Sequence, residues 1–153
     1  MYKRQAYDDT IDMAREIREK FGIKVSVILG PHPVSWEKQV HTIGLQESTF
    51  LHLQAVKLAI KYISSGEAVC LGEVGRPHYP VSLEIWDAAN DLLLEIMKLA
   101  AEAKISIQLH VEENGEKTYS DLAKLCDIAS LPRHLAIRPV SYTHLTLPTI
   151  YSV

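Results

Sequence analysis

Amphipathic helical segments alternate with short apolar segments along this chain, and that alternation limits the folds open to it. Apolar residues recur with helical spacing in four segments, at residues 8–21, 48–64, 82–103 and 118–128. Each is followed by a short run of strand-forming residues, at residues 24–29, 68–73, 105–111 and 135–138. This repeated order predicts an α/β fold in which crossover helices join parallel strands.

The composition narrows the class of protein. The chain has 153 residues, is 47% hydrophobic and 23% charged, and carries a formal net charge of −3, as is typical of one globular domain. It has no basic footprint for nucleic acid and no apolar run long enough to cross a bilayer. Its two cysteines, Cys70 and Cys126, lie far apart in apolar segments. We therefore expect a cytoplasmic protein with reduced thiols, no membrane association and no obligate protein partner.

Polar residues stand where the predicted strands end. The segment AVCLGEVGRPHY, residues 68–79, is an apolar run that carries one acid, Glu73, before a Gly-rich turn. His32 follows the first strand, and His110 lies near the end of the third. Because the carboxyl ends of parallel strands share one edge of a sheet, these side chains should converge. Two imidazoles and a carboxylate are the ligand chemistry of a divalent-metal hydrolase.

Each of these residues also has a purely structural interpretation. Glu73 could cap a helix or pair with Arg76, His110 could be a core histidine, and His32 could be a turn residue. His78 could be a solvated loop residue. The alternative function is then a small, non-catalytic, doubly wound α/β binding domain. An open sheet with helices on both faces and diverging side chains would favour that alternative.

Three motifs carry a family resemblance. GPHPVSW, LGEVGRPHY and QLHVEE together resemble the TatD-related metal-dependent hydrolases, in particular an archaeal branch, over residues 8–138. The resemblance implies part of a TIM-type (β/α)8 barrel, with about four αβ units and parallel strands. It also implies a divalent-metal cofactor (zinc, manganese or magnesium) and a phosphoester substrate, either a small molecule or a nucleic acid. The best-known members are described as deoxyribonucleases.

The same resemblance assigns roles to five residues. Glu73 and His110 would be metal ligands, and no residue of the chain is assigned as catalytic in itself. His32 would lie in the substrate pocket rather than on the metal. Arg76 and His78 replace an Asp-Tyr type of loop and are also predicted to bind substrate, a replacement that leaves specificity for phosphodiesters open.

The resemblance further predicts that the chain is an incomplete hydrolase. The family opens with a strand that carries an HxH metal pair, and no HxH occurs here. Residues 1–138 would form a partial barrel without its first and last strands, inactive by itself. Residues 139–153, PVSYTHLTLPTIYSV, resemble a sequencing adapter translated in frame, and we expect them to be a non-native tail.

Overall fold

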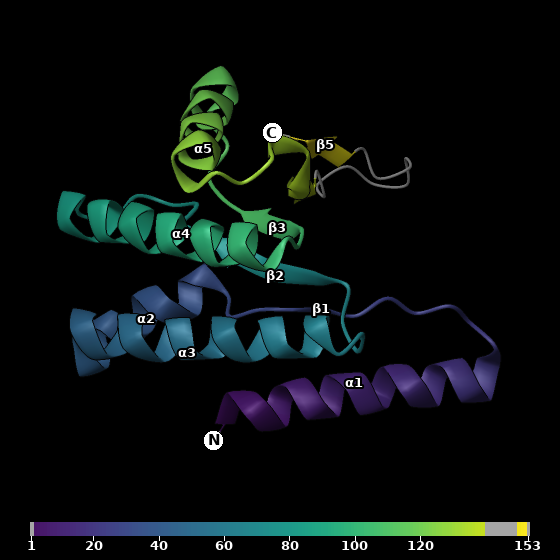
Figure 1. Ribbon diagram of the computed structural model, residues 1–153. Helices are drawn as coiled ribbons and strands as arrows, with labels where there is room; N and C mark the ends of the chain where they lie inside the picture. Colours follow the sequence, from purple (N-terminus) through teal and green to yellow (C-terminus); the bar gives the residue numbers. More distant parts are fainter. Residues whose placement is uncertain (1, 140–149, 153) are drawn as a thin grey trace.

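The computed structural model describes residues 2–139 and 150–152 (Figure 1). In chain order its elements are α1 (Tyr2–Phe21), β1 (Ile28–Leu29), α2 (Pro33–Ile43), α3 (Leu45–Ser64), β2 (Cys70–Gly75), α4 (Leu83–Ala103), β3 (Ile107–His110), α5 (Gly115–Ala129), the 3-10 turn η1 (Arg133–Leu135), β4 (Ala136–Pro139) and β5 (Ile150–Ser152). The four predicted helices and the four predicted strands are all present. Of the predicted tail, residues 140–149 and 153 lie outside the described residues, and its non-native origin stays a prediction.

The strands form one sheet in which spatial order follows chain order. β1, β2, β3 and β4 are parallel neighbours, and β5 adds to β4 in the antiparallel sense. Right-handed crossovers between consecutive parallel neighbours place the connecting helices on the same face of the sheet. A doubly wound sheet requires a point at which the strand order reverses. The doubly wound alternative is therefore wrong for the described strands, and the fold is α/β with the strand order of a partial TIM-type barrel.

In α4, the longest helix, the sequence determines both the buried face and the two ends. In α4 the side chains that face the core recur at three- and four-residue intervals: Ile85, Ala89, Leu92, Leu93, Ile96, Met97 and Ala100. The Ser82 hydroxyl caps the helix by accepting a hydrogen bond from the Ile85 amide. Lys104 ends it in a left-handed conformation. These limits agree with the predicted helix at residues 82–103.

One helix is absent from the sequence prediction. The segment GPHP, predicted only as the end of a strand, leads directly into α2, with Pro33 at the first helical position and His32 at the N-cap. Proline is well suited to the first turn, where its missing N–H needs no partner. Trp36 anchors α2 in the core and donates a hydrogen bond from Nε1 to the Thr49 hydroxyl of α3 at 3.1 Å. β1 covers only Ile28–Leu29 of the strand predicted at residues 24–29.

The core lies on the helix-covered face of the sheet. Leu29, Leu71 and Ile107 are buried there with the apolar sides of the helices. Ile28 and Val69 are exposed, Val69 by 57%. Since neighbouring residues of a strand point to opposite faces, Ile28 lies on the face away from the core.

A buried ion pair joins the segments that follow β2 and β3. Arg76 is 2% exposed, and its guanidinium donates two hydrogen bonds to the Glu112 carboxylate, one of them from Nε at 2.7 Å. Its Nη1 donates to Asn90 Oδ1 of α4 at 2.6 Å, and its Cζ lies over the Trp86 ring, 4.6 Å from the centroid. The Thr118 hydroxyl of α5 donates to the same carboxylate at 3.0 Å. The buried charge is thus neutralised by a carboxylate, and each of the three guanidinium nitrogens donates a hydrogen bond.

Within the described part of the chain, no helix combines the length and apolar composition that crossing a membrane requires. The cytoplasmic location stays a prediction.

Leu71→Ala should destabilise the chain far more than Leu83→Ala. Leu71 is fully buried in β2, and truncating a buried leucine costs about 2–5 kcal/mol through lost burial and the cavity that remains. Leu83 is 81% exposed at the start of α4, so the same substitution should cost less than about 1 kcal/mol. Urea denaturation followed by circular dichroism measures both. Equal shifts in the two midpoints would contradict the assignment of the core face.

Glu112→Gln should lower the free energy of unfolding at neutral pH by about 3 kcal/mol, because it leaves the Arg76 charge buried without a counter-ion. Glu113→Gln is the matched control: that side chain is 75% exposed, and its replacement should change stability by less than about 0.5 kcal/mol. Denaturant titration of both variants provides the comparison.

The cost of Glu112→Gln should also depend on pH. Burial raises the pKa of Glu112, but the hydrogen bonds and charge of Arg76 outweigh it, so that the pKa is lowered from its ordinary value of 4.5. A lowered folded-state pKa gives stability that is present above pH 4.5 and is lost as the pH falls through the folded-state value. The difference between wild type and Glu112→Gln should therefore shrink below that pH. If the difference in free energy of unfolding stayed constant down to pH 3, the ionised Glu112 carboxylate would not be what stabilises the pair.

Candidate metal centre

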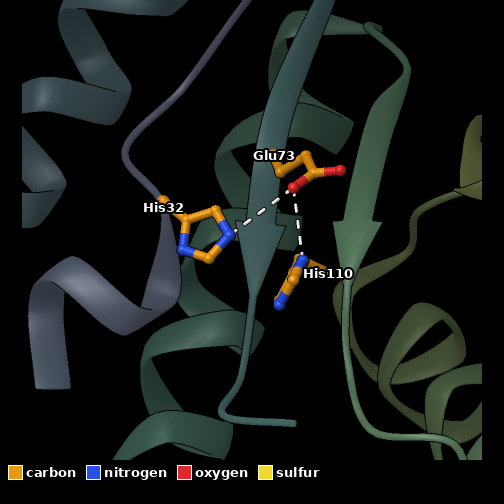
Figure 2. Close-up of side chains that lie close together, drawn as sticks. All are labelled: His32, Glu73 and His110. Carbon is orange, nitrogen blue, oxygen red and sulfur yellow. Dashed lines mark ion pairs between the residues drawn. The ribbon is translucent and has the colours of Figure 1, made fainter.

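Three side chains from the carboxyl ends of consecutive strands meet at one edge of the sheet (Figure 2). His32 follows β1, Glu73 lies in β2, and His110 is the last residue of β3. Glu73 Oε2 lies 3.5 Å from His32 Nε2 and 3.2 Å from His110 Nδ1. The two imidazole rings are 4.3 Å apart between centroids. The predicted convergence of the three residues is therefore present in the structure.

A bulge in β2 directs Glu73 to this edge. Leu71 pairs with Ile107 and Val74 with Leu109, so β2 uses three residues where β3 uses two. Strict alternation would place Glu73 on the same face as the buried Leu71. The extra residue instead lets Leu71 and Val74 both enter the core while Glu73 stays partly exposed beside the histidines. Bulges re-aim side chains in this way next to functional sites.

Two glycines allow β2 and β3 to approach each other closely. A Cβ atom on Gly72 would lie 2.6 Å from Gln108 Cβ, and one on Gly75 would lie 1.9 Å from the His110 carbonyl oxygen. That carbonyl also accepts a hydrogen bond from the Arg76 amide at 3.1 Å. The positions of Glu73 and His110 relative to each other are thus set by backbone contacts.

His32 is also the N-cap of α2, and this role decides which of its ring nitrogens can donate a hydrogen bond at the site. Its Nδ1 accepts a hydrogen bond from the Val34 amide at 3.2 Å and so caps α2. In a neutral imidazole one nitrogen accepts and the other carries the proton. With Nδ1 as the acceptor, the proton is assigned to Nε2, the atom that faces Glu73. His32 is arranged to donate a hydrogen bond at this edge.

His78 lies on the other side of His110. The His78 Nδ1 is 2.7 Å from His110 Nε2, and the two rings are close to perpendicular. His78 is exposed and comes from the loop after β2, the segment in which the sequence placed it as a site candidate. Its predicted role in substrate binding stays a prediction.

Arg76, also predicted to bind substrate, does not share this position. Its guanidinium is buried against Glu112, Asn90 and Trp86, as described above, so its charge is already neutralised. The alternative pairing of Arg76 with Glu73 is wrong, because Arg76 pairs with Glu112 instead. A role of Arg76 in binding substrate stays a prediction to which this geometry lends no support.

Sequence reasoning did not identify two further residues near the site. The Tyr79 hydroxyl donates a hydrogen bond to Glu37 Oε2 of α2 at 2.9 Å, and the Glu37 side chain is mostly buried. Burial and the Glu37 carboxylate raise the pKa of Tyr79 to about 12, so the phenol keeps its proton. Glu37 carried no local pattern in the sequence, because α2 itself was not predicted.

The donor set fits a divalent cation. His32, Glu73 and His110 offer one ligand atom each, all within 4.8 Å of one another, so the group could hold a metal ion. A carboxylate oxygen together with imidazole nitrogen suits zinc or manganese. His32 differs from the other two, because the hydrogen bond that its Nδ1 accepts assigns the ring proton to Nε2, the atom that faces Glu73.

Comparisons with known proteins identify relatives of this chain. The family model described as TatD related DNase matches residues 4–140. The uncharacterised protein MJ1127 of Methanocaldococcus jannaschii is 33% identical over 112 residues, which is 71% of this chain and 40% of that protein. The chain thus spans about 40% of the length of the curated relative it matches. No solved structure matched. The chain belongs to the family of TatD-related DNases.

Proposed function

We propose that Glu73 and His110 are ligands of the divalent-metal centre of a TatD-type hydrolase. The observation that carries this proposal is the meeting of a carboxylate and two imidazoles at the carboxyl ends of three neighbouring parallel strands. This edge is where barrels of this type place their chemistry. A divalent ion bound there would lower the pKa of a water ligand toward about 7 and so supply a nucleophile at neutral pH.

His32 is proposed to bind the anionic oxygen of the substrate. Its Nε2–H faces the cluster, and the hydrogen bond that it accepts at Nδ1 holds the ring in that orientation. A phosphoester oxygen beside the metal would be a natural acceptor for this proton. The Arg76 charge is already paired with Glu112, so this contact is assigned to histidine and not to Arg76. The substrate class proposed is therefore a phosphoester, including the backbone of DNA.

The chain alone is proposed to bind metal without turning over substrate. Catalytic zinc sites use three protein ligands and one open position, whereas Glu73 and His110 supply two. Their affinity for a metal should accordingly be modest. The activity proposed here is that of the whole protein.

Glu73→Gln and His110→Ala should each weaken binding of Zn²⁺ or Mn²⁺ by at least about tenfold, because each removes a ligand atom. Isothermal titration of the full chain measures the dissociation constants. The matched controls are Glu113→Gln and His134→Ala, both exposed and outside the cluster, and they should bind as wild type does. Wild-type binding that survives both ligand substitutions would overturn the proposed site.

Hydrolysis of the chromogenic phosphodiester bis(p-nitrophenyl) phosphate tests the second part of the proposal. With Mn²⁺ present, the chain should give no more product than its Glu73→Gln variant. Turnover by wild type that Glu73→Gln abolishes would support the metal site and show that these residues suffice for catalysis, contrary to our expectation.

A further inference from the structure

We propose that His78 is a positioning residue of the metal centre rather than a substrate ligand. In this role its Nδ1 accepts a hydrogen bond from His110 Nε2, and His110 is left to bind the metal through Nδ1, beside Glu73. The inference rests on the proposed function, because it requires Glu73 and His110 to be ligands.

The two ring nitrogens of His110 face different partners. Nδ1 lies 3.2 Å from Glu73 Oε2, and Nε2 lies 2.7 Å from His78 Nδ1. A nitrogen that binds a metal must offer a lone pair, so in a neutral ring the other nitrogen carries the proton. Histidine ligands generally donate that second N–H to a fixed acceptor, which sets the tautomer and the orientation of the ring. His78 is placed to be this acceptor.

The separation of the two nitrogens argues against His78 as a further ligand of the same ion. With Zn–N bonds of about 2.0–2.1 Å and tetrahedral angles, two imidazole nitrogens on one zinc lie about 3.3 Å apart. The separation of 2.7 Å between His110 Nε2 and His78 Nδ1 is instead the length of a hydrogen bond. His110 Nε2 is also the nitrogen that does not face Glu73.

His78 is itself supported from α2. Its ring packs edge-on against the Tyr79 ring, with 5.1 Å between centroids. The Tyr79 hydroxyl donates to Glu37 Oε2, and the other oxygen of Glu37 lies 2.8 Å from His41 Nε2. The loop that carries His78 is thus tied to α2, the helix that His32 caps.

The test compares His78→Phe with His78→Asn in the full chain. Phenylalanine keeps the ring and removes the acceptor, whereas the Asn Oδ1 can accept near the position of Nδ1. His78→Phe should weaken Zn²⁺ binding by about 10- to 100-fold, and His78→Asn by no more than a few-fold. Ring ¹⁵N spectra of zinc-bound wild type should show the His110 proton on Nε2. Because His78 is exposed, urea midpoints of both variants should equal that of wild type.

The outcomes separate this inference from the proposed function. Wild type that binds zinc, with His78→Phe binding equally well, would overturn the positioning role and leave the metal site standing. Equal losses in His78→Phe and His78→Asn would also overturn it, since the acceptor would then be irrelevant. A wild-type chain that binds no zinc would overturn the proposed function and this inference together. A His110 proton on Nδ1 in the zinc-bound chain would contradict the assignment of the ligand atom.

Discussion

The close backbone contact between the ends of β2 and β3 holds the candidate site together. Gly72 and Gly75 remove the side chains that would keep the two strands apart, and the Arg76 amide then bonds to the His110 carbonyl. The guanidinium of the same residue continues the connection to Glu112. Arg76 thus connects the strand of Glu73 to the segment of His110 in two ways. Its main-chain amide bonds to the His110 carbonyl, and its side chain bonds to Glu112. An acid and an imidazole on separate strands need such a connection if their spacing is to suit a small cation.

Much of the fold and the identity of the central cluster could be predicted from the sequence, because both rest on local periodicity. Alternating helices and strands imply parallel neighbours, and polar residues at strand ends such as Glu73 and His110 then meet at one edge. The bulge was not predictable, since it appears only when β2 is paired with β3. The same holds for Arg76, whose partner lies 36 positions away. An arginine in a Gly-rich turn resembles an anion-binding residue until its counter-ion is known.

The distribution of charge at the site depends on the pairing of Arg76 with Glu112. The Arg76 cation of the loop after β2 is neutralised in the interior by Glu112, whereas the imidazole of His32 lies beside Glu73 and that of His78 beside His110. Histidine donates one hydrogen bond without carrying a fixed charge, so an anionic group at this edge would be held by directed contacts and by a bound metal more than by bulk positive charge.

His32 links this chemistry to the stability of a helix. The ring nitrogen that caps α2 and the ring nitrogen that faces Glu73 belong to one planar group, so neither can turn without moving the other. Fraying of the first turn of α2 would therefore withdraw a donor from the site, and a ligand that held the donor would suppress fraying. Ligand binding at the site and local order at Pro33–Trp36 are therefore thermodynamically linked. Ligand binding should slow amide exchange in the first turn of α2.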